Sequence, residues 1–170
     1  MAPSPLSILV VDDERDTADS LAMLLRMSGH PAESAYDVSS ALSFARQCSP
    51  YLVFLDLPVP DVDGYRLAEQ LRRLPGMKDA VLVCTSGYAG SVYQKRARRV
   101  GFNYFLMKPI DPEGVVRLVG ELAEARRERF ERKARRKEPL PPGTVRQLGW
   151  ATPSPFRGRR CRRFTDLGGP

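Results

Sequence analysis

Five side chains able to take part in chemistry stand at or near the ends of short apolar runs. Three are carboxylates, one is a hydroxyl and one is an amine: Asp12, Asp13, Asp56, Thr85 and Lys108. A charge at the end of a buried strand is costly unless another group pairs with it. Three converging carboxylates repel one another, and Mg²⁺ favours such hard oxygen ligands. A lysine and a hydroxyl at the same place could hold the oxygens of a phosphate group.

Short apolar runs alternate along the chain with segments of helical spacing. Strands are expected at 6–11, 32–35, 51–55, 80–85 and 103–107. We expect helices between them, with caps at Asp37 and Asp63, one helix just before Gly101 and a last helix that opens at Asp111-Pro112. This alternation predicts an α/β fold, a doubly wound five-stranded parallel sheet with helices on both faces. Ligands bind outside the carboxyl ends of the strands in such sheets, so the five side chains should lie together there.

Charge divides the chain into two unequal parts. Residues 1–120 carry 13 Lys and Arg against 14 Asp and Glu, whereas residues 121–170 carry 14 against 6. We therefore expect a folded domain at 1–125, a charged helical extension at 126–138 and a disordered tail at 139–170 that is rich in Pro, Gly and Arg. Within the extension, Glu128 and Arg132 have the spacing of a favourable helical ion pair.

Neither end of the folded region has the features of a membrane or secreted protein. No apolar run approaches the roughly 20 residues that cross a bilayer, and the first residues include no basic leader. We expect a cytoplasmic protein that makes no membrane contact. Cys84, inside an apolar run, is expected to be a buried small side chain. His30 follows a helix stop at Gly29 and is expected to be exposed.

Residues 5–125 resemble the receiver domain of two-component response regulators, the CheY-like superfamily. The matching motifs are VVDDE, VFLDLPVPDVDGY, LVCTSGYA and YFLMKPI, in order at successive strand ends. The resemblance implies a flavodoxin-like fold in which Asp56 accepts a phosphoryl group from a phosphohistidine on a histidine kinase or phosphotransfer protein. The implied Mg²⁺ ligands are Asp12, Asp13, Asp56 and the backbone carbonyl of Pro58.

The resemblance also gives roles to residues around the acceptor. Lys108 would pair with the phosphoryl group, Thr85 would hydrogen-bond to it, and Phe105 occupies the aromatic switch position. Such a domain is a signalling switch for a downstream protein, not a metabolic enzyme, and catalyses only its own phosphorylation and dephosphorylation. Pro58 and Gly87 offer no polar side chain to orient water, so the aspartyl phosphate should hydrolyse slowly. Receiver domains often dimerise through the face that changes on phosphorylation, and the sequence does not decide whether this chain does.

Simpler interpretations exist for each residue taken alone. An acidic pair after a strand is often a helix cap, Lys108 could be a solvated surface lysine, and Phe105 packs well as plain core. An aspartyl-phosphate phosphatase would need an acid two residues after the nucleophile, where this chain has Pro58. The residues at 61–64 do not form a calcium loop, because such a loop would need an acidic or amide residue in place of Val59 and a glutamate in place of Gln70.

Two alternative functions concern the chain as a whole. One is a receiver without phosphotransfer that serves only as a docking scaffold, which the intact acidic, hydroxyl and lysine set disfavours. The other is a nucleic-acid-binding protein that acts through the basic tail, where FRGRRCRRF at 156–164 could contact phosphates with little sequence preference. A solubilising, disordered tail is the simpler interpretation of the same segment.

Overall fold

The chain forms a five-stranded parallel sheet with five helices. It is described by a computed structural model over residues 4–57, 63–88 and 90–135. In chain order the elements are β1 (Ile8–Val11), α1 (Arg15–Met27), β2 (Ala32–Ala35), α2 (Val38–Cys48), β3 (Leu52–Asp56), α3 (Gly64–Arg73), β4 (Val81–Ser86), α4 (Ser91–Val100), β5 (Tyr104–Met107) and α5 (Pro112–Arg135). The strand order is β2-β1-β3-β4-β5, and every pair is parallel. The predicted doubly wound α/β fold is confirmed.

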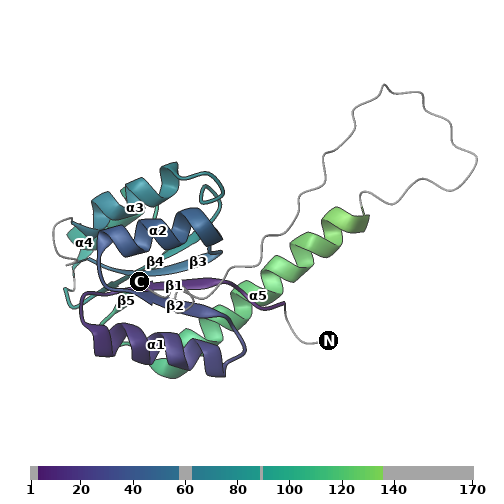
Figure 1. Cartoon of the computed structure of the whole chain (residues 1–170), viewed down its shortest axis with the longest axis horizontal. Coiled ribbons are helices and arrows are strands. Elements are labelled where there is room, and N and C mark those ends of the chain that lie inside the picture. The colour runs from purple at the N-terminus through teal and green to yellow at the C-terminus, as the bar shows by residue number, and fades with distance from the viewer. Residues whose placement is uncertain (1–3, 58–62, 89, 136–170) are drawn as a thin grey trace, which may run out of the picture.

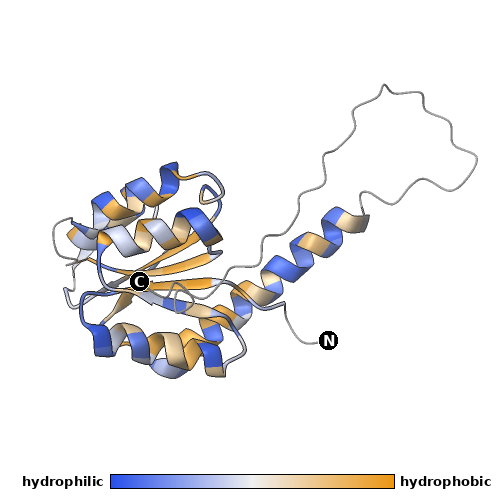
Figure 2. Ribbon diagram, in the orientation of Figure 1, coloured by the Kyte–Doolittle hydropathy of each residue, from blue (hydrophilic) through white to orange (hydrophobic). Residues whose placement is uncertain are grey.

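Helices cover both faces of the sheet (Figure 1). On one face, α1 and α5 pack against the strands through apolar side chains such as Leu25 and Val119. On the other, α2, α3 and α4 contribute Phe44, Leu71 and Ala97 to a second apolar layer. Most strand residues are apolar, with β2 (Ala32–Ala35) the exception, and the helices carry both apolar and polar residues (Figure 2). The sheet is therefore a rigid scaffold whose carboxyl edge can hold polar groups in fixed positions.

The helix boundaries follow the signals in the sequence. Asp37 accepts a hydrogen bond from the Ser40 backbone N–H at 2.7 Å, and so caps α2. Asp63 accepts one from the Tyr65 N–H at 3.1 Å at the start of α3. Gly101 ends α4 with φ at 97°, a left-handed conformation that glycine adopts without strain. These predicted boundaries are confirmed.

The last helix, α5, runs for 24 residues and continues well past the sheet (Figure 1). It crosses residue 125 without a break, so part of the expected extension is helical as predicted. Arg126 stacks over the Tyr51 ring at 4.6 Å, and Phe130 beyond it is 64% exposed. An ion pair on this stretch joins Arg127 and Glu131, one position before the expected Glu128–Arg132 pair. Residues 136–138 and the tail 139–170 lie outside the described residues.

One sequence-based prediction about a single side chain is wrong. His30 is only 6% exposed, because the turn after α1 folds it under the start of β1. Its Nδ1 accepts a hydrogen bond from the Leu6 backbone N–H at 3.1 Å. Cys84, in contrast, is fully buried as predicted. Among the described residues, no helix has the length and apolar character that crossing a bilayer requires.

Candidate functional site

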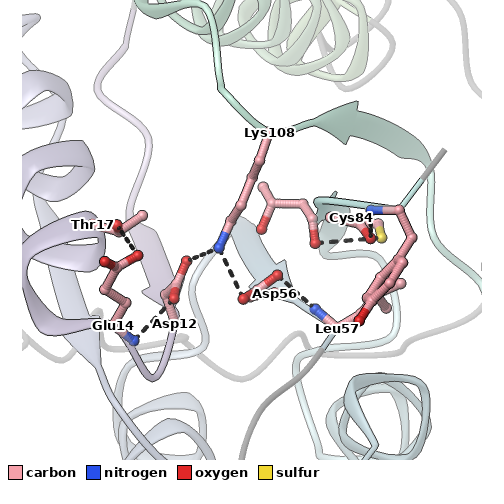
Figure 3. A network of polar contacts seen from close by, with 10 residues as sticks. Asp12, Glu14, Thr17, Asp56, Leu57, Cys84 and Lys108 are labelled. Carbon is pink, nitrogen blue, oxygen red and sulfur yellow. Dashed lines mark hydrogen bonds and ion pairs between the residues drawn. The ribbon is translucent and has the colours of Figure 1, made fainter.

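The polar side chains predicted to meet do lie together at the carboxyl edge of the sheet. Asp12 follows β1, Asp56 ends β3, and Lys108 follows β5. The Lys108 Nζ donates to Asp12 Oδ2 at 2.7 Å and to Asp56 Oδ2 at 2.9 Å (Figure 3). Parallel pairing of β1 with β3, of β3 with β4 and of β4 with β5 brings these residues together from across the chain. The result is two buried carboxylates bridged by one ammonium group.

Asp13 completes an acidic cluster with the two buried carboxylates. One oxygen from each of Asp12, Asp13 and Asp56 lies within 4.8 Å of the others. Asp12 and Asp56 are 3% and 2% exposed, whereas Asp13 faces solvent. Hard oxygen donors at this spacing, open to water on one side, are compatible with Mg²⁺, which keeps several water ligands. Pro58, whose carbonyl was expected as a further ligand, lies outside the described residues.

The charge state of the cluster depends on burial and on Lys108. Burial raises the pKa of Asp56, and the nearby charge of Asp12 raises it further, while the hydrogen bond from Lys108 opposes both. Burial alone would lower the pKa of Lys108, but its hydrogen bonds to Asp12 and Asp56 outweigh that effect and the pKa is raised. Lys108 therefore stays protonated and supplies the positive charge that two buried carboxylates need.

Backbone groups hold the Asp56 carboxylate in place. Its Oδ1 accepts a hydrogen bond from the Leu57 N–H at 3.0 Å, while Oδ2 contacts Lys108 (Figure 3). Leu57 is in turn tied to the start of α3, because its carbonyl accepts from the Gly64 N–H at 2.9 Å. A β-carbon at Gly64 would lie 2.6 Å from the Asp56 carbonyl oxygen. Only glycine lets α3 approach this closely.

The remaining predicted side chains, Thr85 and Phe105, lie on β4 and β5. Thr85 pairs in register with Asp56 and is 2% exposed. Phe105 is half-buried on β5, where it lines a cavity of about 280 Å³ between β5 and α4 together with Ala97 and Tyr104. The Lys108–Pro109 peptide bond is cis.

Sequence reasoning missed the supporting contacts of the site. The Glu14 backbone N–H donates to Asp12 Oδ1 at 3.1 Å, and the Glu14 carboxylate accepts from Thr17 on α1 at 2.7 Å (Figure 3). These contacts tie Asp12 to the first turn of α1. The close approach of α3 at Gly64 has one signal in the sequence, the Asp-Gly pair before a helix, but that pair predicts only a helix cap. Backbone donors such as the Leu57 N–H leave no mark in a sequence.

Comparison with known proteins identifies this arrangement. The sequence model of the response regulator receiver domain matches residues 8–119. The chain belongs to this family. It is thus a receiver domain of two-component response regulators, a signalling switch and not a classical enzyme. An association with histidine kinases or phosphotransfer proteins is general to such receiver domains.

Individual relatives agree with the family. An uncharacterised 14.6 kDa protein of Leptolyngbya boryana is 36% identical over 114 residues, which is 67% of this chain and 87% of that protein. The DNA-binding regulator RpaA of Synechocystis is 32% identical over 140 residues, 81% of this chain and 57% of RpaA. The chain spans about half the length of this and other matching regulators.

Solved structures show the same fold. The CheY-like receiver domain of Methanospirillum hungatei superposes with a TM-score of 0.67 at 24% identity, covering 74% of this chain and 99% of that one. A response regulator from Chloroflexus aurantiacus gives a TM-score of 0.65 at 26% identity, covering 71% and 99%.

Proposed function

We propose that this receiver domain takes a phosphoryl group onto Asp56 from the phosphohistidine of a histidine kinase or phosphotransfer protein in the cytoplasm. Asp12, Asp13, Asp56 and the Pro58 carbonyl would hold Mg²⁺, which would neutralise charge on the phosphoryl oxygens when bound. We assign the receiver to residues 1–125, a charged helical extension to 126–138 and a disordered basic tail to 139–170. The observation that carries the proposal is the bridge from Lys108 to both Asp12 and Asp56 beside the solvent-facing Asp13.

The residues of the chain itself account for the transfer. An oxygen of Asp56 would attack phosphorus while the bond from phosphorus to the donor nitrogen breaks and that nitrogen leaves with the electron pair. The Leu57 N–H and Lys108 fix the orientation of the carboxylate before the reaction. Because Lys108 is hydrogen-bonded to both Asp12 and Asp56, its positive charge is already in place as negative charge accumulates on the transferring oxygens.

The switch follows from the neighbours of Asp56. Thr85, in register beside it, would turn its hydroxyl to a phosphoryl oxygen and draw the end of β4 toward the site. Phe105 would then rotate into the space vacated, with the cavity between β5 and α4 giving its ring room to move. The exposed surface of α4 and β5 would change shape, and this surface would be read by a downstream protein.

Intact-mass spectrometry after incubation with acetyl phosphate and Mg²⁺ tests the proposal. We expect one added phosphoryl group, absent when a chelator removes the metal and absent from Asp56→Asn. Asp79→Asn is the matched control, because it removes an exposed carboxylate in the loop between α3 and β4 and should label normally. Equal labelling of Asp56→Asn and the unaltered chain would refute the assignment of Asp56.

A further inference from the structure

A groove beside the acidic cluster lies between α1 and the segment that joins β5 to α5. It encloses about 540 Å³. Most of its lining residues are apolar, beside one lysine and three other polar residues: Asp16, Thr17, Ser20, Leu21, Leu24, Lys108, Pro109, Ile110 and Pro112. Lys108 belongs to both the groove and the cluster, so whatever occupies the groove lies next to Asp56.

Acidic residues lie in and beside the lining of this groove. Asp16 lines it, Asp111 and Glu113 flank the lining residue Pro112 in the chain, and Asp13 stands just before α1; all four are exposed. Lys108, the lysine in the lining, is already engaged by Asp12 and Asp56. The groove therefore combines apolar lining with carboxylates that form no ion pair within the described part of the chain, and the segment that fits it is basic with aromatic side chains.

We propose that residues 156–164 of this same chain dock in the groove. The segment FRGRRCRRF has five arginines between two phenylalanines. Phe156 or Phe164 would fill the apolar floor against Leu21, Leu24 and Ile110, which removes ring surface from water. The arginines would lie along the rim, where their planar guanidinium groups suit paired hydrogen bonds to carboxylates.

The length of the chain permits this contact within one molecule. α5 begins at Pro112 in the groove wall and ends at Arg135, so its 24 residues carry the chain about 36 Å away. The 21 residues from Arg135 to Phe156 can span up to about 70 Å when extended. Returning to the groove uses about half of that reach, so the tail needs no unusual conformation.

The docked tail would act as an intramolecular inhibitor. Arginine-rich chain beside Lys108 would cover the approach to Asp56 and compete with a phosphodonor protein, a consequence that rests on the proposed function. Docking itself does not rest on it, because the groove, its charge and the tail exist whether or not Asp56 is phosphorylated.

Fluorescence of Trp150 in the full-length chain tests docking directly. It is the chain's one tryptophan and stands six residues before Phe156, so its anisotropy reports the freedom of the tail. The measurement is made with a reductant present, so that no disulfide constrains Cys161. We expect higher anisotropy at 0.01 M than at 1 M salt, because the screening length falls from about 30 Å to about 3 Å.

Charge-reversal variants locate the contact. Each exposed ion pair changes an equilibrium by a factor of about 1.4 to 5, so Asp16→Arg with Glu113→Arg should lower the ratio of docked to free tail by about 2-fold to 30-fold. Glu69→Arg on α3 is the matched control, since it changes charge away from the groove and should leave the ratio unaltered. Adding Arg159→Asp and Arg160→Asp to the groove variant should restore docking.

Several results would overturn the proposal. If the Trp150 anisotropy is the same at both salt concentrations and in the groove variants, the tail does not dock in the groove. Anisotropy that rises with protein concentration would assign the contact to a second copy of the chain. A change seen only when duplex DNA is added would assign the tail to nucleic acid instead.

Phosphorylation provides the second readout. With acetyl phosphate the groove variant should label at the same rate as the unaltered chain or faster, and with a phosphohistidine protein it should label several-fold faster. If Trp150 shows docking but no chain labels at all, the proposed function fails while the contact stands. If labelling occurs but Trp150 shows no docking, the docking proposal fails while the proposed function stands.

Discussion

Replacing Gly64 by alanine should destabilise the receiver and disturb Asp56. A β-carbon there would lie 2.6 Å from the Asp56 carbonyl oxygen and 2.8 Å from both the Cα and the carbonyl oxygen of Leu57. All three are backbone atoms at the end of β3 and cannot rotate away. Such overpacking costs about 1–3 kcal/mol, while alanine gains up to about 1 kcal/mol over glycine in helix preference. Gly64 is the first residue of α3, where this helix-interior preference applies only in part, so we expect a net loss of about 1–2 kcal/mol.

Urea unfolding of the two proteins, followed by circular dichroism, measures this loss. Gly120→Ala is the matched control, because a β-carbon at this position in α5 meets nothing within 4 Å. That substitution should stabilise the chain by about 0.4–1 kcal/mol. Gly64→Ala should also label more slowly with acetyl phosphate, since the clash pushes the Leu57 N–H from the carboxylate. Stability of Gly64→Ala equal to that of the unaltered chain would contradict the close approach of α3 to β3.

Three further predictions concern His30, Lys108 and the lifetime of the phosphoryl group. Burial lowers the pKa of His30, so below about pH 6.5 the unfolded chain binds more protons than the folded chain and stability falls. The urea concentration at the unfolding midpoint should therefore be lower at pH 5.5 than at pH 7. The decrease should be smaller in His30→Asn, which keeps an acceptor for the Leu6 N–H. Lys108→Met should lower the free energy of unfolding at pH 7 without divalent cations, because two buried carboxylates lose their shared partner. We expect about 1–3 kcal/mol, less than the roughly 3–5 kcal/mol of a fully buried pair because the Lys108 side chain is 25% exposed; equal stability in urea would contradict the bridge. The phosphorylated chain should keep its added mass for minutes or longer after the phosphodonor is removed, and a half-life of seconds would contradict the role given to Pro58 and Gly87.

Much of the fold could be predicted because local signals and global architecture agree. The alternation of apolar runs and helical spacing identified all five strands, including the weakly marked Ala32–Ala35. Capping residues such as Asp37 and Asp111 act on the backbone of their own helix, so their effect can be read locally. His30 was placed wrongly because its burial depends on contact with Leu6, 24 residues earlier, which no local pattern records.

The charged groups of the site could be predicted from the sequence, but the backbone hydrogen bonds that orient them could not. Carboxylates and a lysine at strand ends are rare enough to stand out, and parallel topology brings the ends together. The contacts that orient them come from backbone groups, such as the Leu57 N–H on Asp56 and the Glu14 N–H on Asp12. Every residue has a backbone N–H, so only the folded geometry shows which ones matter.

Mapping the phosphoryl group to a residue tests the central claim most directly. Borohydride reduces an aspartyl phosphate to homoserine, and tandem mass spectrometry of the digested chain then identifies the position that changed. We predict homoserine at position 56 after treatment with a phosphodonor and Mg²⁺, and none without the metal. Homoserine at another aspartate, or at none while the intact mass shows a phosphoryl group, would contradict the assignment of Asp56 as the acceptor.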